Sequence, residues 1–254
     1  MSYENIIIRN ENSVAIINLD RPKSLNALNS ELIDELDRAF DELAVDPEVR
    51  VVVITGEKNF AAGADITNMV ELSPDEARSF AFTPTFNKIA NFPKPVIAAI
   101  EGFALGGGME LALCCDIRIA APGAKMGFPE INLGIFPGAG GTQRLPRLIG
   151  ASKAKKLIFT GSMVEGEAAL ELGLVDSLAD NPLEEAVKLA GKLAGKAPIA
   201  LKLAKECINS AGDVDLQTGT KIEAISWSGL FATVDQREGM RAFIEKRKAV
   251  FVGK

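Results

Sequence analysis

Two glutamates in glycine-containing segments are the strongest candidates for acid–base chemistry in this sequence. Glu110 ends the segment Gly102–Glu110, and Glu130 lies near the start of the segment Phe128–Arg144. The chain has no histidine, which excludes Ser-His-Asp triads, Cys-His pairs and histidine metal ligands. Proton transfer near neutral pH must therefore use carboxyl groups, lysine, tyrosine, cysteine or water. Paired carboxylates are the simplest of these devices.

The three glycines before Glu110 offer hydrogen-bond donors to an anion. Gly106, Gly107 and Gly108 stand where a short helix is expected to begin, and the first turn of a helix exposes unpaired N–H groups. Glu110 follows Gly107 by three residues, so the two share one helix face. A glutamate in a first turn also serves as a partner of the helix dipole, and this segment alone does not separate the two uses.

A second small-residue loop, Asn59–Ile66, directly follows the apolar run Val51–Ile54. Open α/β sheets bind ligands at loops of this kind, although a tight strand-to-helix turn has the same composition. Glu130 has apolar neighbours, and desolvation raises the pKa of a carboxyl group toward the range of a general acid. An exposed loop glutamate is the alternative. Together the three segments predict one site with backbone donors and two glutamates.

Composition narrows the classes of partner. The chain has 254 residues, with 28 basic and 34 acidic side chains and a net charge of −6. This balance argues against nucleic acid and anionic membrane surfaces as partners. The sequence shows neither a signal peptide nor an apolar run of membrane-spanning length, and its three cysteines are too few for a disulfide framework. We therefore expect a cytoplasmic protein that needs no metal.

The elements that must position these residues change in character along the chain. Apolar runs predict strands and helical periodicity predicts helices, and the two alternate in the first half. The predicted strands there are Ile6–Arg9, Val14–Leu19, Val51–Ile54, Pro95–Ile100 and Ile117–Ala120, and the predicted helices are Ser30–Leu43, Ser73–Ala90 and Met109–Cys115. Beyond about Gly150 the predicted elements are helices at Ser152–Phe159, Glu165–Leu172, Leu183–Leu193, Ile199–Asn209, Leu216–Phe231 and Asp235–Lys246.

Six blocks of this sequence, in order, resemble the crotonase family, also called the enoyl-CoA hydratase/isomerase family. The blocks are LDRPKSLNAL at Leu19–Leu28, NFAAGADI at Asn59–Ile66, GFALGGGME at Gly102–Glu110, CDI at Cys115–Ile117, FPEINLGIFPGAGGTQR at Phe128–Arg144 and EGMRAFIEKRKAVF at Glu238–Phe251. The resemblance implies an α/β fold, a crotonase-like spiral of repeated ββα units with a helical C-terminal region. We expect the spiral core in residues 1–195 and a helical oligomerisation region in residues 196–254.

The resemblance also implies roles for individual residues. The backbone N–H groups of Ala64 and Gly107 would polarise the oxygen of an acyl-CoA thioester and stabilise an enolate-like transition state. Glu110 would activate water, Glu130 would exchange the proton at the α carbon, and Gly138 would help position the reacting groups. The residues expected at the CoA moiety are Lys23, Leu25, Ala62, Ala64, Asp65 and Ile66, with Phe243 and Lys246 contributed by a neighbouring subunit of a homotrimer or homohexamer.

Reversible hydration of a trans-2-enoyl-CoA to a 3-hydroxyacyl-CoA is the activity we predict, because hydratases of this family are associated with two glutamates. CoA then enters as part of the substrate, and no separate cofactor is expected. The alternative within the family is a Δ3-Δ2 enoyl-CoA isomerase or another acyl-CoA enzyme of the crotonase family. Outside this chemistry, the alternatives are an RNA-binding module, against which the acidic balance argues, and a purely structural scaffold.

Three residues depart from the pattern of close hydratase relatives. Phe128 stands where glutamine is frequent, Met109 where cysteine is frequent, and Thr67 where several relatives have lysine. A bulky Phe128 beside Glu130 is expected to reshape the acyl pocket or to dry that carboxyl group further. Thr67 puts one phosphate contact in doubt. The preferred length and branching of the acyl chain stay open.

Overall fold

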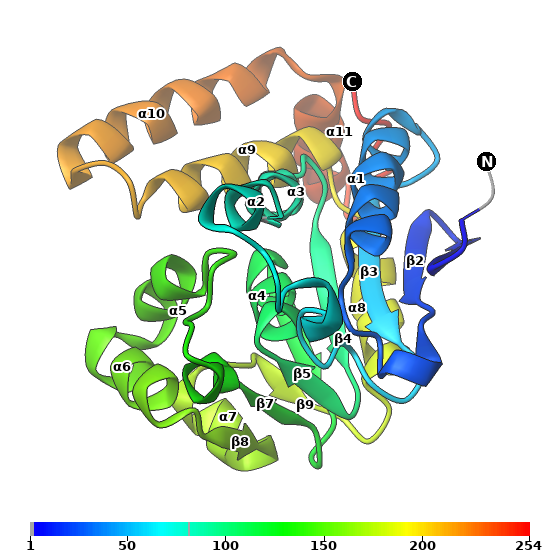
Figure 1. Ribbon diagram of the computed structural model, residues 1–254. Coiled ribbons are helices and arrows are strands. Elements are labelled where there is room, and N and C mark those ends of the chain that lie inside the picture. The colour runs from blue at the N-terminus through cyan, green and yellow to red at the C-terminus, as the bar shows by residue number, and fades with distance from the viewer. Residues whose placement is uncertain (1–2, 81) are drawn as a thin grey trace.

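The strands form two sheets in a computed structural model that describes residues 3–80 and 82–254 (Figure 1). The larger sheet has the order β1-β2-β3-β4-β6-β9, and the smaller has the order β5-β7-β8. The pair β1–β2 is antiparallel, and the other neighbours in the larger sheet are parallel. The strands of the larger sheet are β1 (Ile6–Glu11), β2 (Val14–Leu19), β3 (Val51–Gly56), β4 (Val96–Ile100), β6 (Ile117–Ala120) and β9 (Ser177–Leu178).

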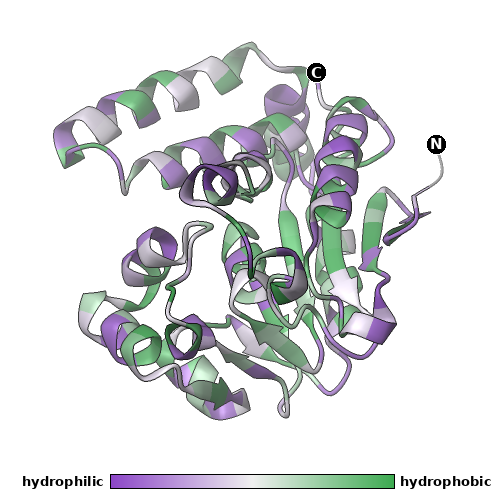
Figure 2. Cartoon of the chain, viewed as in Figure 1, coloured by the Kyte–Doolittle hydropathy of each residue, from purple (hydrophilic) through white to green (hydrophobic). Residues whose placement is uncertain are grey.

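Alternation of side chains along β3 divides the interior into two apolar layers. Val52 and Ile54 belong to the main core, whereas Val51 and Val53 pack on the opposite face. Helix α8 (Pro182–Ala194) covers that opposite face with small side chains four residues apart, which are Ala186, Ala190 and Ala194. Figure 2 shows the hydrophobic residues concentrated in these central strands. A strand covered on both faces explains the continuous apolar run in the sequence.

The chain repeats a strand–short strand–helix unit, which is the predicted ββα spiral. β4 is followed by β5 (Phe103–Leu105) and α4 (Gly107–Cys114), and β6 is followed by β7 (Lys125–Gly127) and the 3-10 helix η3 (Pro129–Leu133). Each unit places a long strand in the larger sheet and a short one in the smaller. The third short strand is β8 (Met163–Glu165), and a bridge from Ala61 to Ala104 extends this row toward the loop after β3.

The region predicted as one helix over Ser73–Ala90 contains two, so that prediction was wrong. Helix α2 (Pro74–Ser79) begins after Ser73, where the predicted helix starts, and Ser73 and Glu76 form a capping box there; α3 (Thr83–Ala90) begins separately. Pro84 explains the new start, because proline lacks an N–H and its ring clashes with the carbonyl four residues earlier. The break brings aromatic residues to the wall of the cavity described below.

The remaining helices of the first two thirds are η1 (Pro22–Ser24), α1 (Ser30–Val45), η2 (Ile66–Asn68), α5 (Gly141–Ile149), α6 (Ala151–Thr160) and α7 (Gly166–Leu172). Among them, α1, α6 and α7 lie close to the predicted ranges, whereas η1, η2 and α5 were not predicted. Asn29 caps α1 by accepting from the N–H of Leu32, and a row of apolar residues on one face of α1 is buried. No helix in the described ranges is long and apolar enough to cross a membrane.

The last 60 residues or so form a helical layer beside the core (Figure 1). It comprises α9 (Pro198–Ser210), α10 (Leu216–Gly229), η4 (Leu230–Ala232) and α11 (Val234–Ile244). The Lys205 ammonium joins α9 to the core by an ion pair of 2.9 Å with Asp116, and Arg50 donates to the carbonyl oxygen of Phe251 at 2.8 Å. Side chains of α10 are largely exposed, including Trp227 and Ile225.

Candidate active site

A cavity of about 220 Å³ brings together the three segments singled out from the sequence. The loop after β3 contributes Ala62 and Ala64, the start of α4 contributes Gly107 and Glu110, and η3 contributes Glu130. Most of the remaining wall is apolar, with Met69, Phe80, Phe82, Leu133, Ile135 and Phe136 among its residues. The cavity can therefore accept an apolar chain at one part and present backbone donors and two carboxyl groups at another.

Glu110 is buried, and two amides of the same chain hold its carboxyl group. Its Oε1 accepts hydrogen bonds of 2.7 Å from the N–H groups of Ala139 and Gly141. Gly141 begins α5, so this carboxylate lies at the positive end of α5. Burial raises the pKa of Glu110, whereas the two amides and the nearby Arg144 act in the opposite direction by stabilising the charged form. From the sequence, only the dipole of the helix that contains Glu110 was expected to act on this carboxyl group.

Glu130 has a different environment from Glu110. Its Oε2 is buried and has no hydrogen-bond partner. Desolvation, with a smaller contribution from the charge of Glu110, raises the pKa of Glu130 to about 7. The sequence predicted this direction from the apolar neighbours. The site therefore holds one carboxyl group supported by amides and one that readily carries a proton near neutral pH.

Ala64 and Gly107, the two residues expected to supply backbone N–H donors, line the same cavity. Gly107 is the first residue of α4, where an amide has no acceptor within the helix. In the parallel bridge between Leu28 and Ala64, the N–H of Leu28 donates to the carbonyl oxygen of Gly63, and the N–H of Asp65 donates to the carbonyl oxygen of Leu28. The N–H of Ala64 takes no part in this bridge and is directed away from it. A Cβ placed on Gly107 would lie 3.5 Å from the amide nitrogen of Ala64, so the backbone of Gly107 passes close to that amide. Such a pair can bind a single oxyanion.

Glycine at position 106 is required by both backbone and space. Its φ of 50° lies in the left-handed region, and a Cβ there would come within 2.9 Å of Glu130 Oε1. Glycine is needed beside Glu110 for a similar reason, because a Cβ on Gly141 would lie 2.9 Å from Glu110 Oε1. Two glycines thus make room for the two carboxyl groups.

The residues expected around CoA are only partly gathered at this cavity. Ala62, Ala64 and Ile66 line it, as does Gly138. Leu25 reaches the same loop by accepting from the N–H of Ala62 at 3.1 Å. The remaining expected residues, Lys23, Asp65, Phe243 and Lys246, are not among those lining the cavity in the described parts of the chain.

The residues that depart from the family pattern have clear places. Phe128 and Met109 are fully buried, and neither belongs to the described lining of the cavity, so Phe128 acts on the site through core packing and not as an exposed wall. The Thr67 hydroxyl donates to Asp65 Oδ1 at 2.6 Å, and Asp65 also pairs with Arg21 at 3.2 Å. Thr67 therefore supports the loop that carries Ala64.

Two kinds of residue in this site were not predicted from the sequence. The amides of Ala139 and Gly141 were not recognised as partners of Glu110, although the glycine-rich run around them was a signal of exposed N–H groups. The aromatic wall formed by Phe80 and Phe82 was assigned to the interior of one long helix. In that region, Pro84 was the signal that the helix would break.

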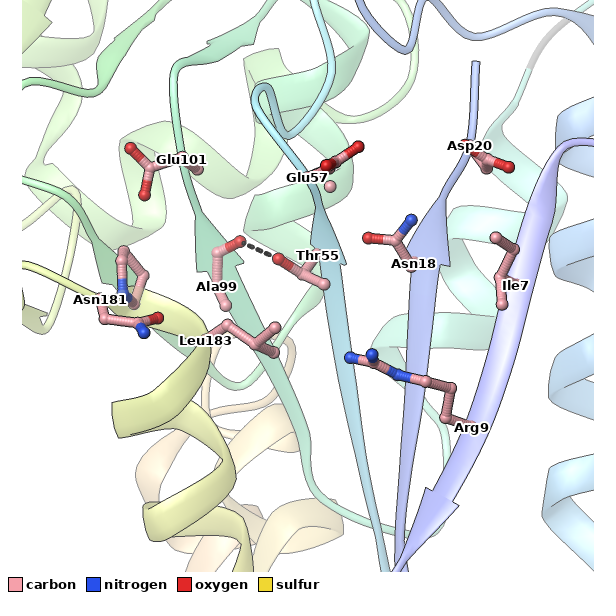
Figure 3. Close-up of a pocket in the computed structure, with 12 residues that line it drawn as sticks. Ile7, Arg9, Asn18, Asp20, Thr55, Glu57, Ala99, Glu101, Asn181 and Leu183 are labelled. Carbon is pink, nitrogen blue, oxygen red and sulfur yellow. Dashed lines mark hydrogen bonds between the residues drawn. The ribbon is translucent and has the colours of Figure 1, made fainter. Parts of the chain in front are cut away.

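A wider groove of about 430 Å³ lies on the face of the large sheet that carries α8 (Figure 3). Its acidic side chains, Asp20, Glu57 and Glu101, each follow the last residue of a strand. Thr55 is already engaged, since its hydroxyl donates to the carbonyl oxygen of Ala99 at 3.1 Å. Neither predicted glutamate and neither predicted oxyanion donor lines this groove, so the smaller cavity is the candidate active site.

No group of three or more His, Cys, Asp or Glu side chains is arranged to hold a metal ion within residues 3–80 and 82–254. The thiols of Cys114 and Cys115 are buried in the core, and burial raises the pKa of Cys114 to about 12. These thiols are therefore protonated near neutral pH and are poor metal ligands or nucleophiles.

Glu130→Gln is expected to stabilise the fold at pH 8. The folded-state pKa of about 7 lies above the ordinary 4.5, so Glu130 lowers stability as pH rises from 4.5 through 7. Glutamine removes that cost, and the advantage in Tm over the wild type should grow by a few degrees between pH 5 and pH 8, since 1 kcal/mol moves Tm by roughly 2–4 °C in proteins of this size. Calorimetry at both pH values measures it. The exposed Glu171→Gln serves as control, and an advantage that stays constant with pH would contradict the expectation.

Comparison with known proteins decides the family. The model of a family described as "Enoyl-CoA hydratase/isomerase" matches residues 9–254. The chain belongs to the enoyl-CoA hydratase/isomerase family. It is 46% identical to a crotonyl-CoA hydratase of Syntrophomonas wolfei over 260 aligned positions that cover both chains completely. It is 45% identical to a short-chain-enoyl-CoA hydratase of Clostridium acetobutylicum, with 98% of this chain and 97% of the relative covered.

Solved structures of the enoyl-CoA hydratase/isomerase family have the same fold. The crystal structure of an enoyl-CoA hydratase from Bacillus anthracis is 41% identical, has a TM-score of 0.95 and covers 99% of this chain and 100% of its own. A structure from Geobacillus kaustophilus has the same TM-score at 43% identity, with 99% of each chain covered. The family and the crotonase-like fold predicted from six sequence blocks are thus confirmed.

Proposed function

We propose that the protein is an enoyl-CoA hydratase, which reversibly adds water to a trans-2-enoyl-CoA to give a 3-hydroxyacyl-CoA. One observation carries the proposal. A single cavity contains an amide-supported carboxyl group, a second carboxyl group whose pKa is about 7, and two adjacent backbone donors. Hydration needs each of these parts: an acceptor for a proton of water, a donor of a proton to carbon, and a site for the oxyanion.

The thioester oxygen is proposed to bind between the N–H groups of Ala64 and Gly107. Negative charge grows on that oxygen as water attacks C3, because the electrons of the C2–C3 double bond move toward the carbonyl. Fixed amides stabilise this charge without reorganising, and Gly107 adds the positive end of α4. Gly138, which lines the cavity, is proposed to help align the reacting groups.

The two glutamates balance the proton transfers. Ionised Glu110 accepts one proton from water as the C3–O bond forms, and neutral Glu130 donates its proton to C2. The product then contains the elements of one water molecule, and the carboxyl groups have exchanged protonation states, which solvent restores. No electron is transferred to an acceptor, so we propose that no redox cofactor takes part and that CoA enters with the substrate.

The names of the relatives favour a short acyl chain. The Syntrophomonas relative is named a crotonyl-CoA hydratase and the Clostridium relative a short-chain-enoyl-CoA hydratase. The cavity of about 220 Å³ with an aromatic wall agrees with that size class. Crotonyl-CoA is therefore the first substrate to test, together with longer, branched and cyclic enoyl-CoA thioesters.

The decisive experiment supplies crotonyl-CoA in ¹⁸O-labelled water and identifies the product by mass. We expect 3-hydroxybutyryl-CoA carrying one labelled oxygen. A second assay offers a 3-enoyl-CoA, the substrate of the alternative Δ3-Δ2 isomerase. Isomerisation without any water adduct would overturn the hydratase proposal and favour the alternative. Retention on heparin at low salt would favour an RNA-binding role.

We propose that residues 1–195 form the catalytic core and residues 196–254 an oligomerisation region, in a cytoplasmic homotrimer or homohexamer. Large apolar side chains exposed on the C-terminal helices support this, among them Leu216, Ile225 and Trp227 on α10 and Phe243 on α11. Phe243 and Lys246 are proposed to complete the CoA site of a neighbouring subunit, where CoA also contacts that subunit's Lys23, Leu25, Asp65 and Ile66.

Light scattering tests the oligomeric state. It should give a mass of three or six times 27.0 kDa, and a stable monomer would contradict the proposal.

A further inference from the structure

Arg144 is the one charged side chain of α5 that reaches the loop holding Glu110. Its Nη1 donates to the carbonyl oxygen of Ala139 at 3.1 Å, and its Nη2 donates to Asn87 Oδ1 on α3 at 2.6 Å. The carbonyl of Ala139 belongs to the peptide unit between the two units whose N–H groups bind Glu110. Arg144 therefore fixes the middle of the segment whose two ends hold the carboxylate.

Glycine at position 140 allows this arrangement. Gly140 has a φ of 107°, and a Cβ there would overlap the guanidinium group of Arg144. The side chain of Arg144 is thus folded back over the backbone of its own N-terminal turn. An arginine that only contacts solvent would be free to extend, whereas the Arg144 side chain is held against this backbone.

Helix α3 reaches the same loop through one face. Asn87 and Thr83 are four residues apart, and Thr83 Oγ1 lies 3.5 Å from the carbonyl oxygen of Gly138. The loop from Gly138 to Gly141 is consequently attached to Glu110 on one side and to α3 on the other. The aromatic wall of the cavity ends at Phe82, directly before α3.

We propose that Arg144 is a positioning residue for hydration, held by Asn87, that keeps the Ala139–Gly141 amides and its own positive charge directed at Glu110. The inference rests on the proposed function. The charged or titratable groups that face Glu110 are Arg144 from α5, Glu130 from η3 and Cys114 from its own helix. Arg144 is the cation among them, and it favours the ionised form of Glu110.

Replacing Arg144 separates this role from simple structural support. Arg144→Met should lower kcat about tenfold or more with little change in KM, because a catalytic group displaced by about 1 Å loses on the order of 10²-fold in rate. The acid limb of the kcat profile should move to higher pH, since Glu110 loses a cation that stabilises its charge. Arg144→Lys keeps the positive charge but lacks the paired N–H donors of a guanidinium group. It should therefore leave the acid limb of the kcat profile in place and have a higher kcat than Arg144→Met.

Arg147→Met is the matched control, because Arg147 lies one turn along α5 and donates to Gln143. It should match the wild type in kcat and in pH profile. Asn87→Ala keeps the charge of Arg144 and removes its anchor, so it should lower kcat by a smaller factor and leave the limb unmoved. If Arg144→Met fails to fold, Arg144→Lys and Asn87→Ala decide: wild-type kcat in both would overturn the proposal.

The assays distinguish this inference from the proposed function. A wild type that is inert toward every enoyl-CoA would contradict the hydratase proposal, whereas an active wild type matched by Arg144→Met would contradict only the positioning role. A lower kcat in Arg144→Met with an unmoved acid limb would also overturn it, as the effect would then be structural. Titration of ¹³C-labelled Glu110 by NMR gives a readout independent of turnover, and its pKa should rise in Arg144→Met.

Discussion

Glu110→Gln and Glu130→Gln should each lower kcat for hydration at least about a hundredfold, the usual contribution of one general acid or base. The two losses have different causes. Glutamine at position 110 retains an Oε1 that can accept from Ala139 and Gly141, so the fold around it is preserved while the acceptor for a proton of water is lost. Glutamine at position 130 fills the same space as the neutral acid, but its amide N–H is too weakly acidic to protonate C2.

Steady-state turnover of crotonyl-CoA measures both losses, with circular dichroism as the check on folding. Glu57→Gln is the control, because Glu57 lies in the wider groove and not in the candidate site. It should have the kcat of the wild type. The proposed roles would be refuted by near-normal turnover in both single variants. Their double variant should lose far less than the product of the two single losses, because both groups act in one step.

Gly107→Pro should lower kcat by about 10²–10³-fold, the range found when one oxyanion donor is removed. Proline deletes the N–H of Gly107 and nothing else that the helix needs, since proline is favoured at the first position of a helix. The variant tests the backbone donor, which no side-chain substitution reaches. KM should change less than kcat, because the charge on the thioester oxygen is largest in the transition state.

Gly107→Ala provides the matched control. A Cβ at this position would have its nearest neighbours at 3.5 Å, the distance of ordinary packing, and alanine retains the N–H. Gly107→Ala should therefore keep most of the activity that Gly107→Pro loses. Wild-type activity in both variants would exclude Gly107 as a donor, and an equal loss of activity in both would point to crowding of the cavity. Thermal unfolding of both variants shows whether the start of α4 is intact.

Patterns local in sequence predicted the central strands and the two carboxyl groups. β2 has the bounds expected from its β-branched run, and β3 begins at the expected Val51. The glycines before Glu110 do begin a helix, and Ala64, Gly107 and Glu110 line one cavity. These features follow from periodicity and from the special backbone of glycine, both of which act within a few residues.

Features that depend on distant parts of the chain were not predicted from periodicity. β5 and β7 have three residues each, which is too short for an alternating pattern, and they are strands only because they pair with other strands of the smaller sheet. The partners of Glu110 lie 29 and 31 residues further along the chain, so only the folded backbone brings them together. The resemblance supplied the spiral, but it did not supply these contacts.

The bonds from the start of α5 to Glu110 also constrain how this protein can change during evolution. A lineage that replaced Glu110 by an apolar residue would leave the amides of Ala139 and Gly141 buried without an acceptor, at a cost of roughly 1–3 kcal/mol for each. The same loss would expose a pair of donors at the positive end of a helix, where an anionic group of a new substrate could bind. Loss of the old chemistry would thus create the recognition element of a new one.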